Sequence, residues 1–238
     1  MQRMPPEGVA QLLAKVEVLG PLSREGALWL ARRTPEMRFE EGQTIHGPDY
    51  DTTIIFALLE GRVRLYKLLG GEEMTLELIE AGPLFGDVPA LAGRRRETYA
   101  EALLPSRVAL ISARVMNQLI RENPEVGRRL AEGLSERLYE YQQRMIDVAL
   151  KKVPARLASL LVRLFETQGV VSRAGVRIDT HYTHEQLATM IGAKRVAVSR
   201  AMGELRGVGA VDVKGRLLYL KDQAALTRAA EKVGRSEA

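Results

Sequence analysis

The spacing of apolar residues changes near residue 35. From 9 to 33 they recur at helical intervals with a break at Gly20-Pro21, which predicts two short helices. From 37 to 111 they form short alternating runs, at 38–40, 53–59, 61–69, 74–79, 99–102 and 107–111. Gly70-Gly71 separates two of these runs and predicts a tight hairpin, because glycine tolerates the positive φ of such turns. Short strands with glycine-rich turns are typical of a small barrel or jelly roll.

A long helix is predicted after this β-rich region. Asn123-Pro124 marks its start and Val153-Pro154 its end, because the residue before a proline disfavours helical φ and ψ. Apolar residues recur every 3.5 positions on average along it, and we take them as candidate dimerisation residues: Leu134, Leu138, Tyr141, Met145 and Val148. The same period also fits one amphipathic helix that packs on its own β-domain.

Residues 183–205 carry the most informative motif. Thr183, with Gln186 three positions later, predicts a capping box at a helix start. Gly192 predicts the tight turn to a second helix. The apolar residues that give the two helices their inner faces are Leu187, Ala188, Ile191, Val198, Met202 and Leu205. Two short helices that cross in this way form a helix-turn-helix.

The second helix of this motif is expected to present a polar, basic face. Its exposed residues should be Lys194, Arg195, Val196, Ser199 and Arg200. Arginine binds guanine bidentately, valine contacts the thymine methyl group, and serine or lysine binds phosphate. Residues 209–220 predict a hairpin wing whose Lys214 and Arg216 reach the DNA backbone, and Thr183 completes the candidate DNA-binding set. The alternative is a helical hairpin with a solvated basic face.

The formal net charge of +5 is distributed unevenly. Residues 1–150 hold 19 basic and 22 acidic side chains, residues 151–220 hold 12 and 5, and the last 18 hold 4 and 3. An acidic body joined to a basic segment is expected when one module binds a polyanion such as nucleic acid.

Composition excludes several function classes. The chain has no cysteine, which excludes disulfides, thiolate zinc sites, cysteine-ligated clusters and cysteine nucleophiles. It has no nucleophile elbow, P-loop or His/carboxylate metal cluster, so we expect no enzyme and no metal. A ligand-binding enzyme with an accessory helical domain is the alternative. Neither a signal peptide nor an apolar run of membrane length is present, so we expect a cytoplasmic protein without a membrane partner.

The order of a β-module, a long helix and a winged helix-turn-helix resembles the CRP/FNR superfamily of bacterial transcription regulators across essentially the whole chain. Residues 195–200 resemble the recognition helix of the cyanobacterial nitrogen regulators within it, whereas the commoner version has glutamate at the position of Val196. The resemblance implies a homodimer that binds double-stranded DNA at a two-fold site with half-sites like GTA and TAC. RNA polymerase is a further implied partner.

The implied fold class is α+β, with a cyclic-nucleotide-binding-like β jelly roll, a long dimerisation helix and a winged helix-turn-helix. We expect four segments along the chain. Residues 1–122 form the β-roll sensor domain with its N-terminal helices, 123–152 the dimerisation helix, and 153–223 the DNA-binding domain. Residues 224–238 are expected to form a tail with a short helix that frays.

The resemblance also indicates an effector pocket, in which Leu84 to Asp87 and Tyr99 to Ala102 correspond to the ligand-binding stretch of the superfamily. The candidate pocket residues are Phe85, Gly86, Asp87, Arg96 and Thr98. Asp87 stands where the superfamily has glutamate, and Glu97-Thr98 where it has Arg-Ser or Arg-Thr.

The carboxylate of Glu97 at the phosphate-binding position would repel a cyclic phosphate. Cyclic AMP is therefore not expected unless Arg94, Arg95 or Arg96 supplies the cation at that position. We expect no cofactor, and either no effector or an unidentified small molecule, with a cyclic-AMP-dependent regulator as the alternative. His46, beside Gly47-Pro48, is expected to be a loop residue rather than a haem ligand. Thr183 as N-cap separates His181 from His184, which argues against a metal pair.

Overall fold

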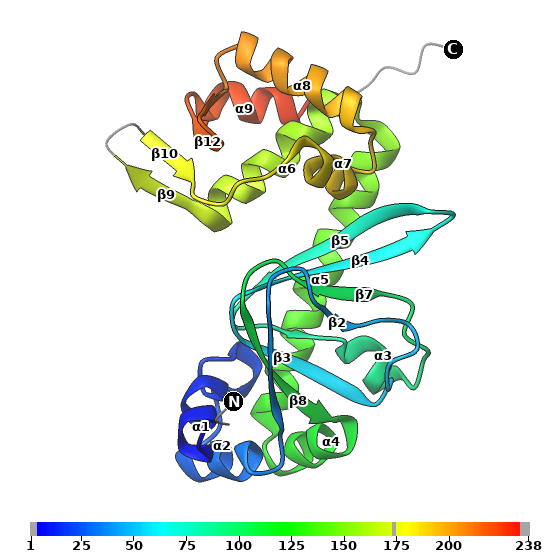
Figure 1. Cartoon of the computed structure of the whole chain (residues 1–238), viewed down its shortest axis with the longest axis vertical. Coiled ribbons are helices and arrows are strands. Elements are labelled where there is room, and N and C mark those ends of the chain that lie inside the picture. Colours follow the sequence, from blue (N-terminus) through cyan, green and yellow to red (C-terminus); the bar gives the residue numbers. More distant parts are fainter. Residues whose placement is uncertain (1–3, 173–174, 234–238) are drawn as a thin grey trace. The chain divides into compact units, whose positions relative to one another are not determined.

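The computed structural model describes residues 4–172 and 175–233. The chain forms two compact units, Met1–Leu138 and Tyr139–Ala238, and the long helix α5 (Pro124–Leu150) contains the boundary between them (Figure 1). Among the residues described, every helix is too short or too polar to cross a lipid bilayer.

The first unit begins with the expected pair of short helices. These are α1 (Pro6–Leu13) and α2 (Arg24–Ala31), with a 3-10 turn η1 (Glu17–Leu19) between them. The Ser23 hydroxyl caps α2 by accepting a hydrogen bond from the Gly26 N–H at 3.1 Å. Leu13, Leu19 and Leu30 are fully buried in one apolar cluster, which also contains residues of the following strands.

Within residues 4–138, the strands form two antiparallel sheets, with orders β1-β8-β3-β6 and β2-β7-β4-β5. Their bounds are β1 (Glu36–Phe39), β2 (Thr44–His46), β3 (Ile54–Glu60), β4 (Arg62–Leu69), β5 (Glu72–Glu80), β6 (Leu84–Phe85), β7 (Tyr99–Ala102) and β8 (Ser106–Ser112). A second apolar cluster, with Phe56, Phe85 and Ala100, joins the two sheets. The expected jelly roll is therefore confirmed.

Three details of the β-roll can be compared with the predictions from the sequence. Gly70 and Gly71 have φ of 61° and 86° and form the turn of the β4–β5 hairpin, as predicted. β2 and β6 were not predicted, because three and two residues are too few to show an alternating pattern. His46 ends β2 and is buried, so its expected place in a loop was wrong.

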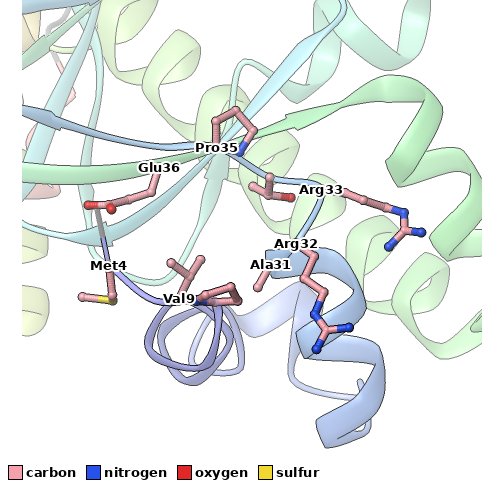
Figure 2. Close-up of a pocket in the computed structure, with 9 residues that line it drawn as sticks. Met4, Val9, Ala31, Arg32, Arg33, Pro35 and Glu36 are labelled. Atoms are coloured by element: carbon pink, nitrogen blue, oxygen red, sulfur yellow. The ribbon is translucent and has the colours of Figure 1, made fainter. Parts of the chain in front are cut away.

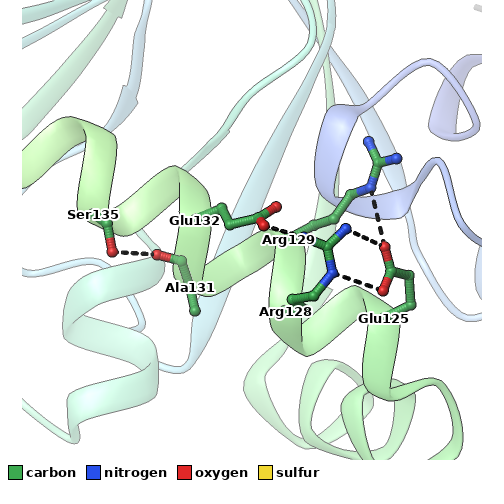
Figure 3. Close-up of polar contacts among 6 residues, drawn as sticks. All are labelled: Glu125, Arg128, Arg129, Ala131, Glu132 and Ser135. Carbon is green, nitrogen blue, oxygen red and sulfur yellow. Dashed lines mark hydrogen bonds and ion pairs between the residues drawn. The ribbon is translucent and has the colours of Figure 1, made fainter.

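Three helices complete this unit. They are α3 (Asp87–Ala92), α4 (Ala113–Glu122) and the first part of α5, which begins at the predicted proline and ends at Leu150. Val126 and Leu130 bury one face of α5 in the apolar cluster of the N-terminal helices. The other face carries a ladder of ion pairs in which Arg128 contacts Glu125 and Glu132 (Figure 3). These pairs lie one helical turn apart and are exposed, so each adds little stability.

The second unit packs helices on a small sheet of order β11-β12-β10-β9. Its elements are α6 (Val153–Gln168), β9 (Gly169–Ser172), β10 (Gly175–Ile178), α7 (His184–Ile191), α8 (Arg195–Gly207), β11 (Val211–Lys214), β12 (Leu217–Leu220) and α9 (Gln223–Ala230). The last helix, α9, corrects one expectation. Asp222 caps it, Leu226 is buried, and it packs on α6, so residues 223–230 belong to this core instead of a frayed tail. The end of the chain, 234–238, lies outside the described residues.

A surface cavity of about 440 Å³ lies beside the N-terminal helices (Figure 2). Met4, Val9 and Ala31 give it an apolar wall, and Arg32 and Arg33 lie at its rim. The carboxylate of Glu36 lies 3.1 Å from the guanidinium of Arg107, so the acidic group of the cavity is already paired within the β-roll. None of the candidate site residues lines this cavity.

Candidate nucleic-acid interface and sensor pocket

The turn between α7 and α8 has the predicted geometry. The Thr183 hydroxyl accepts from the Gln186 N–H at 3.1 Å, and the Gln186 side chain accepts from the Thr183 N–H at 2.8 Å, which closes the capping box. Gly192 has φ of 60°, and the next N–H, of Ala193, bonds to Ala188 at 3.0 Å. All six predicted inner-face residues are buried.

The outer face of α8 is open to solvent. Its candidate DNA-binding residues Lys194, Arg195, Val196, Ser199 and Arg200 are all exposed, and Val196 is 63% exposed although it is aliphatic. Within residues 4–172 and 175–233, the charged groups of Lys194, Arg195 and Arg200 form no ion pair. These cations are free to bind an external anion.

The wing adds two more cations. β11 and β12 pair from Val211↔Leu220 to Lys214↔Leu217, and Gly215, with φ of 63°, forms the turn between them. Lys214 and Arg216 flank this turn and are exposed. Lys214 Nζ lies 5.5 Å from the Tyr219 ring centroid, a cation–π distance that keeps the ammonium group on the wing.

One contact at this face was not predicted. His184 Nδ1 lies 2.8 Å from Ser199 Oγ, although 15 residues separate them in the chain. His184 is the first residue of α7, and Ser199 lies in the middle of the exposed face of α8. The sequence contains no signal for this pair, because it depends on the crossing of two helices.

The position of the expected effector pocket is occupied by the side chain of one of its own candidate residues, Arg96. Arg96 is 2% exposed, and its Nη2 donates to the Ile54 carbonyl at 2.8 Å. The guanidinium packs 5.2 Å from the Phe56 ring centroid and directly on Gly86, where a Cβ would lie 2.3 Å from Nη1. Gly86 is the position where the resemblance places ligand contacts, and here the Arg96 side chain covers it.

The aromatic side chains around Arg96 form a stack. The ring centroids of Phe56 and Phe85 are 5.0 Å apart, and that of His46 lies 5.0 Å from Phe56. Arg96 Nη1 lies 3.5 Å from His46 Nε2. Burial and this guanidinium lower the pKa of His46 to about 3, so its imidazole is neutral and accepts from Arg96.

Glu97 does not enter the pocket, contrary to the expectation that its carboxylate would repel a ligand there. It is exposed, and Lys67 Nζ donates to it at 2.6 Å, which lowers the pKa of the Glu97 carboxyl. Residues 96–98 directly precede β7, and burial changes along them, with Arg96 buried, Glu97 exposed and Thr98 half-buried.

Asp87 is held by an ion pair outside its own segment. Its carboxylate is buried, and Arg137 of α5 binds both oxygens, at 2.5 and 3.2 Å. Both carboxylate oxygens of Asp87 are therefore already paired with the guanidinium of Arg137. Among the residues described, no group of three His, Asp or Glu side chains is arranged to hold a metal ion.

The candidate dimerisation residues fall into two kinds. Leu134 is half-buried and packs against the apolar cluster of the first unit. Leu138, Tyr141, Met145 and Val148 are exposed, with Leu138 at 59% and Met145 at 67%. Of these five residues, only Leu134 is therefore covered by the apolar cluster of the β-roll unit.

Comparison with known proteins agrees with this architecture. The cyclic nucleotide-binding domain family matches residues 36–123, and the Crp-like helix-turn-helix domain family matches residues 155–229. The global nitrogen regulator of Nostoc sp. (strain PCC 7120) is 30% identical over 193 residues, which cover 80% of this chain and 86% of that protein. The chain belongs to the CRP/FNR superfamily of transcription regulators.

Two further relatives show the range of this superfamily. The CRP-like cAMP-activated global transcriptional regulator of Mycobacterium tuberculosis is 21% identical over 221 residues, covering 92% of this chain and 99% of that one. The crystal structure of a CRP-family transcriptional regulator from Thermus thermophilus has a TM-score of 0.70 at 29% identity, covering 82% of this chain and 97% of that one. The CRP/FNR chain described here is thus a DNA-binding transcription regulator and not an enzyme.

Proposed function

We propose that this CRP/FNR regulator is a homodimer that reads a two-fold DNA site with GTA-like and TAC-like half-sites and needs no small-molecule effector. The observation that carries the proposal is the exposed face of α8, on which unpaired cations surround one aliphatic residue and one hydroxyl. Such a face suits the major groove, where arginine reads guanine and an aliphatic side chain meets the thymine methyl group.

The half-site sequence is proposed from the resemblance to the nitrogen regulators. Residues 195–200 resemble their recognition helix, including Val196 in place of the commoner glutamate. Glutamate accepts a hydrogen bond from cytosine, whereas valine favours the methyl group of thymine. Lys214 and Arg216 of the wing, together with Thr183, are proposed to bind the flanking phosphates.

Dimerisation is supported by α5. A helix that exposes Leu138, Tyr141, Met145 and Val148 in a 3.5-residue period has the apolar pattern of a coiled-coil seam. A second copy of the same helix would cover this seam by two-fold symmetry. Two recognition helices would then bind half-sites about one helical turn of DNA apart.

Effector-free activity is supported by Arg96 and Asp87. A ligand that approached Gly86 would have to displace the Arg96 guanidinium from Ile54 O, and Asp87 is already bound to Arg137. A cyclic-AMP-dependent regulator is the second candidate, because the cyclic nucleotide-binding family matches residues 36–123. In that case Arg96 must leave its buried position to bind the phosphate.

Fluorescence anisotropy tests both candidates. The full chain is titrated onto a two-fold GTA/TAC duplex and a scrambled duplex over a salt series, alone and then with cyclic AMP. Salt is varied because phosphate contacts alone give tight nonspecific binding at low ionic strength. We expect specific binding without ligand. Specific binding only with cyclic AMP would establish the second candidate, and equal affinity for both duplexes would contradict the assignment of α8.

RNA polymerase is the remaining proposed partner. Transcription in vitro from a promoter that carries the two-fold site should change when the regulator is added to purified polymerase. The direction of the change will distinguish an activator from a repressor.

A further inference from the structure

The contact between His184 and Ser199 links the two helices of the helix-turn-helix at the surface proposed to meet DNA. Nδ1 and Oγ lie 2.8 Å apart, a normal hydrogen-bond distance. Ser199 is exposed between Arg195 and Arg200, so its hydroxyl has solvent on one side and the His184 ring on the other. Half-buried His184 is held at the first position of α7, directly after the N-cap residue Thr183 and within its capping box.

The protonation of an imidazole nitrogen decides whether a serine hydroxyl bonded to it donates to a third group or accepts from it. If Nδ1 carries no proton, the hydroxyl donates to it, and the outward lone pairs of Oγ can only accept. If Nδ1 carries the proton, it donates to Oγ, and the hydroxyl hydrogen is free to donate outward. These two arrangements recognise opposite base-edge groups. The first suits the amino groups of cytosine or adenine, and the second suits the acceptors of guanine or thymine.

The geometry points to His184 as a specificity-determining positioning residue that fixes the hydroxyl of Ser199 in one direction, so that Ser199 reads one base-edge group. A free serine hydroxyl rotates and accepts or donates as its neighbour requires, and therefore discriminates poorly. Restricting it to one direction leaves the opposite type of base-edge group unpaired, which is what generates discrimination. The inference rests on the proposed function, because it requires α8 to lie in the major groove.

Six variants of the full chain test this inference, five single ones and the double variant Ser199→Ala with His184→Ala. Ser199→Ala removes the hydroxyl, and His184→Ala removes the ring. His184→Asn places a polar atom near the position of Nδ1, whereas His184→Gln places one near that of Nε2. His181→Ala is the matched control, since His181 is exposed and lies outside α7. Thermal unfolding of each variant checks that the winged helix-turn-helix remains folded.

The readout is anisotropy on a panel of duplexes that differ from the two-fold site by one base pair at a time, at two salt concentrations. We expect Ser199→Ala to reduce discrimination at one base position by about fivefold or more. His184→Ala should reduce it at the same position, and the double variant should lose no more than either single one. His184→Asn should restore discrimination, His184→Gln should not, and His181→Ala should match the wild type.

Three results would overturn the inference. A uniform loss of affinity over all duplexes on His184→Ala, with a smaller salt dependence, would make His184 a phosphate contact. Rescue of base discrimination by His184→Gln instead of His184→Asn would assign the positioning contact to Nε2, in disagreement with the Nδ1 contact. Unchanged discrimination in Ser199→Ala would remove Ser199 from base reading. Failure of the proposed function is distinguishable, because the wild type itself would then show no preference among the duplexes.

Discussion

Arg137 in α5 binds both carboxylate oxygens of Asp87, the first residue of α3, across 50 positions of the chain. The shorter contact is 2.5 Å, and Asp87 is almost completely buried. A carboxylate in this position is costly without its cation, because burial removes the water that would otherwise solvate it. The pair therefore fastens α5 to the β-roll at the residue that follows Gly86.

Removal of Arg137 should destabilise the β-roll unit strongly. Arg137→Ala leaves a buried carboxylate unpaired, so we expect the free energy of unfolding to fall by about 3 kcal/mol. Urea unfolding followed by circular dichroism measures this change. Arg128→Ala on the same helix is the matched control, because Arg128 belongs to an exposed ladder and its loss should leave the midpoint unchanged. Equal midpoints for the two variants would contradict this account of the Asp87 pair.

Acid should unfold the β-roll partly through His46. The folded-state pKa of His46 is about 3 and its ordinary value is 6.5. The unfolded chain therefore binds a proton in this window that the folded chain does not, and stability falls as pH drops from 6.5 towards 3. One such group contributes up to about 1.4 kcal/mol per pH unit.

His46→Phe tests this contribution, because a phenyl ring keeps the stack with Phe56 and cannot bind a proton. Urea midpoints are compared at pH 7, 5.5 and 4.5. The lowered pKa values of the Asp51 and Glu97 carboxyls contribute to acid loss in both proteins, so the readout is the difference between them. Parallel pH profiles for the wild type and the variant would rule out His46 as a source of acid sensitivity.

Arg200 and Lys214 should have different effects on DNA binding. Arg200→Ala is expected to weaken binding to the two-fold site by about 1 to 3 kcal/mol and to relax base preference at one position. Lys214→Ala is expected to weaken binding to all duplexes alike and to lower the salt slope by about 1. Anisotropy over a salt series separates the two effects. A uniform loss on Arg200→Ala would assign Arg200 to phosphate.

A charged side chain at position 145 should leave the protomer folded but weaken the dimer. Its side chain is 67% exposed, so Met145→Glu leaves the protomer folded, while a carboxylate in the proposed seam would be buried against its two-fold copy. We expect the dimer dissociation constant to rise more than about tenfold, which corresponds to 1.4 kcal/mol. Sedimentation equilibrium measures it.

Gln142→Glu provides the control for charge alone, because Gln142 is exposed and outside the apolar stripe of the same helix. Its dissociation constant should match that of the wild type. If Met145→Glu were as dimeric as the wild type, the seam would have to lie elsewhere.

Local patterns in the sequence sufficed for most of the architecture. The change of period from helical to alternating predicted the β-roll, and Pro124 and Pro154 marked the limits of the long helix. Thr183, Gln186 and Gly192 predicted the capping box and turn, because these residues act on backbone groups within a few positions. The exposed face of α8 followed from the same helical period. These features depend on neighbours along the chain, and for that reason the sequence alone determined them.

The position of the Arg96 side chain was decided by tertiary structure. Arg96 belongs to a run of three arginines, and only the packing of β3 and β6 around it places its guanidinium on Gly86. The pairs Asp87–Arg137 and His184–Ser199 join residues 50 and 15 positions apart, and α9 is ordered by burial of Leu226 in the second unit. Each of these depends on how separate elements meet in space. No periodicity or local propensity specifies such a meeting, because the free energy comes from burial and pairing between distant segments.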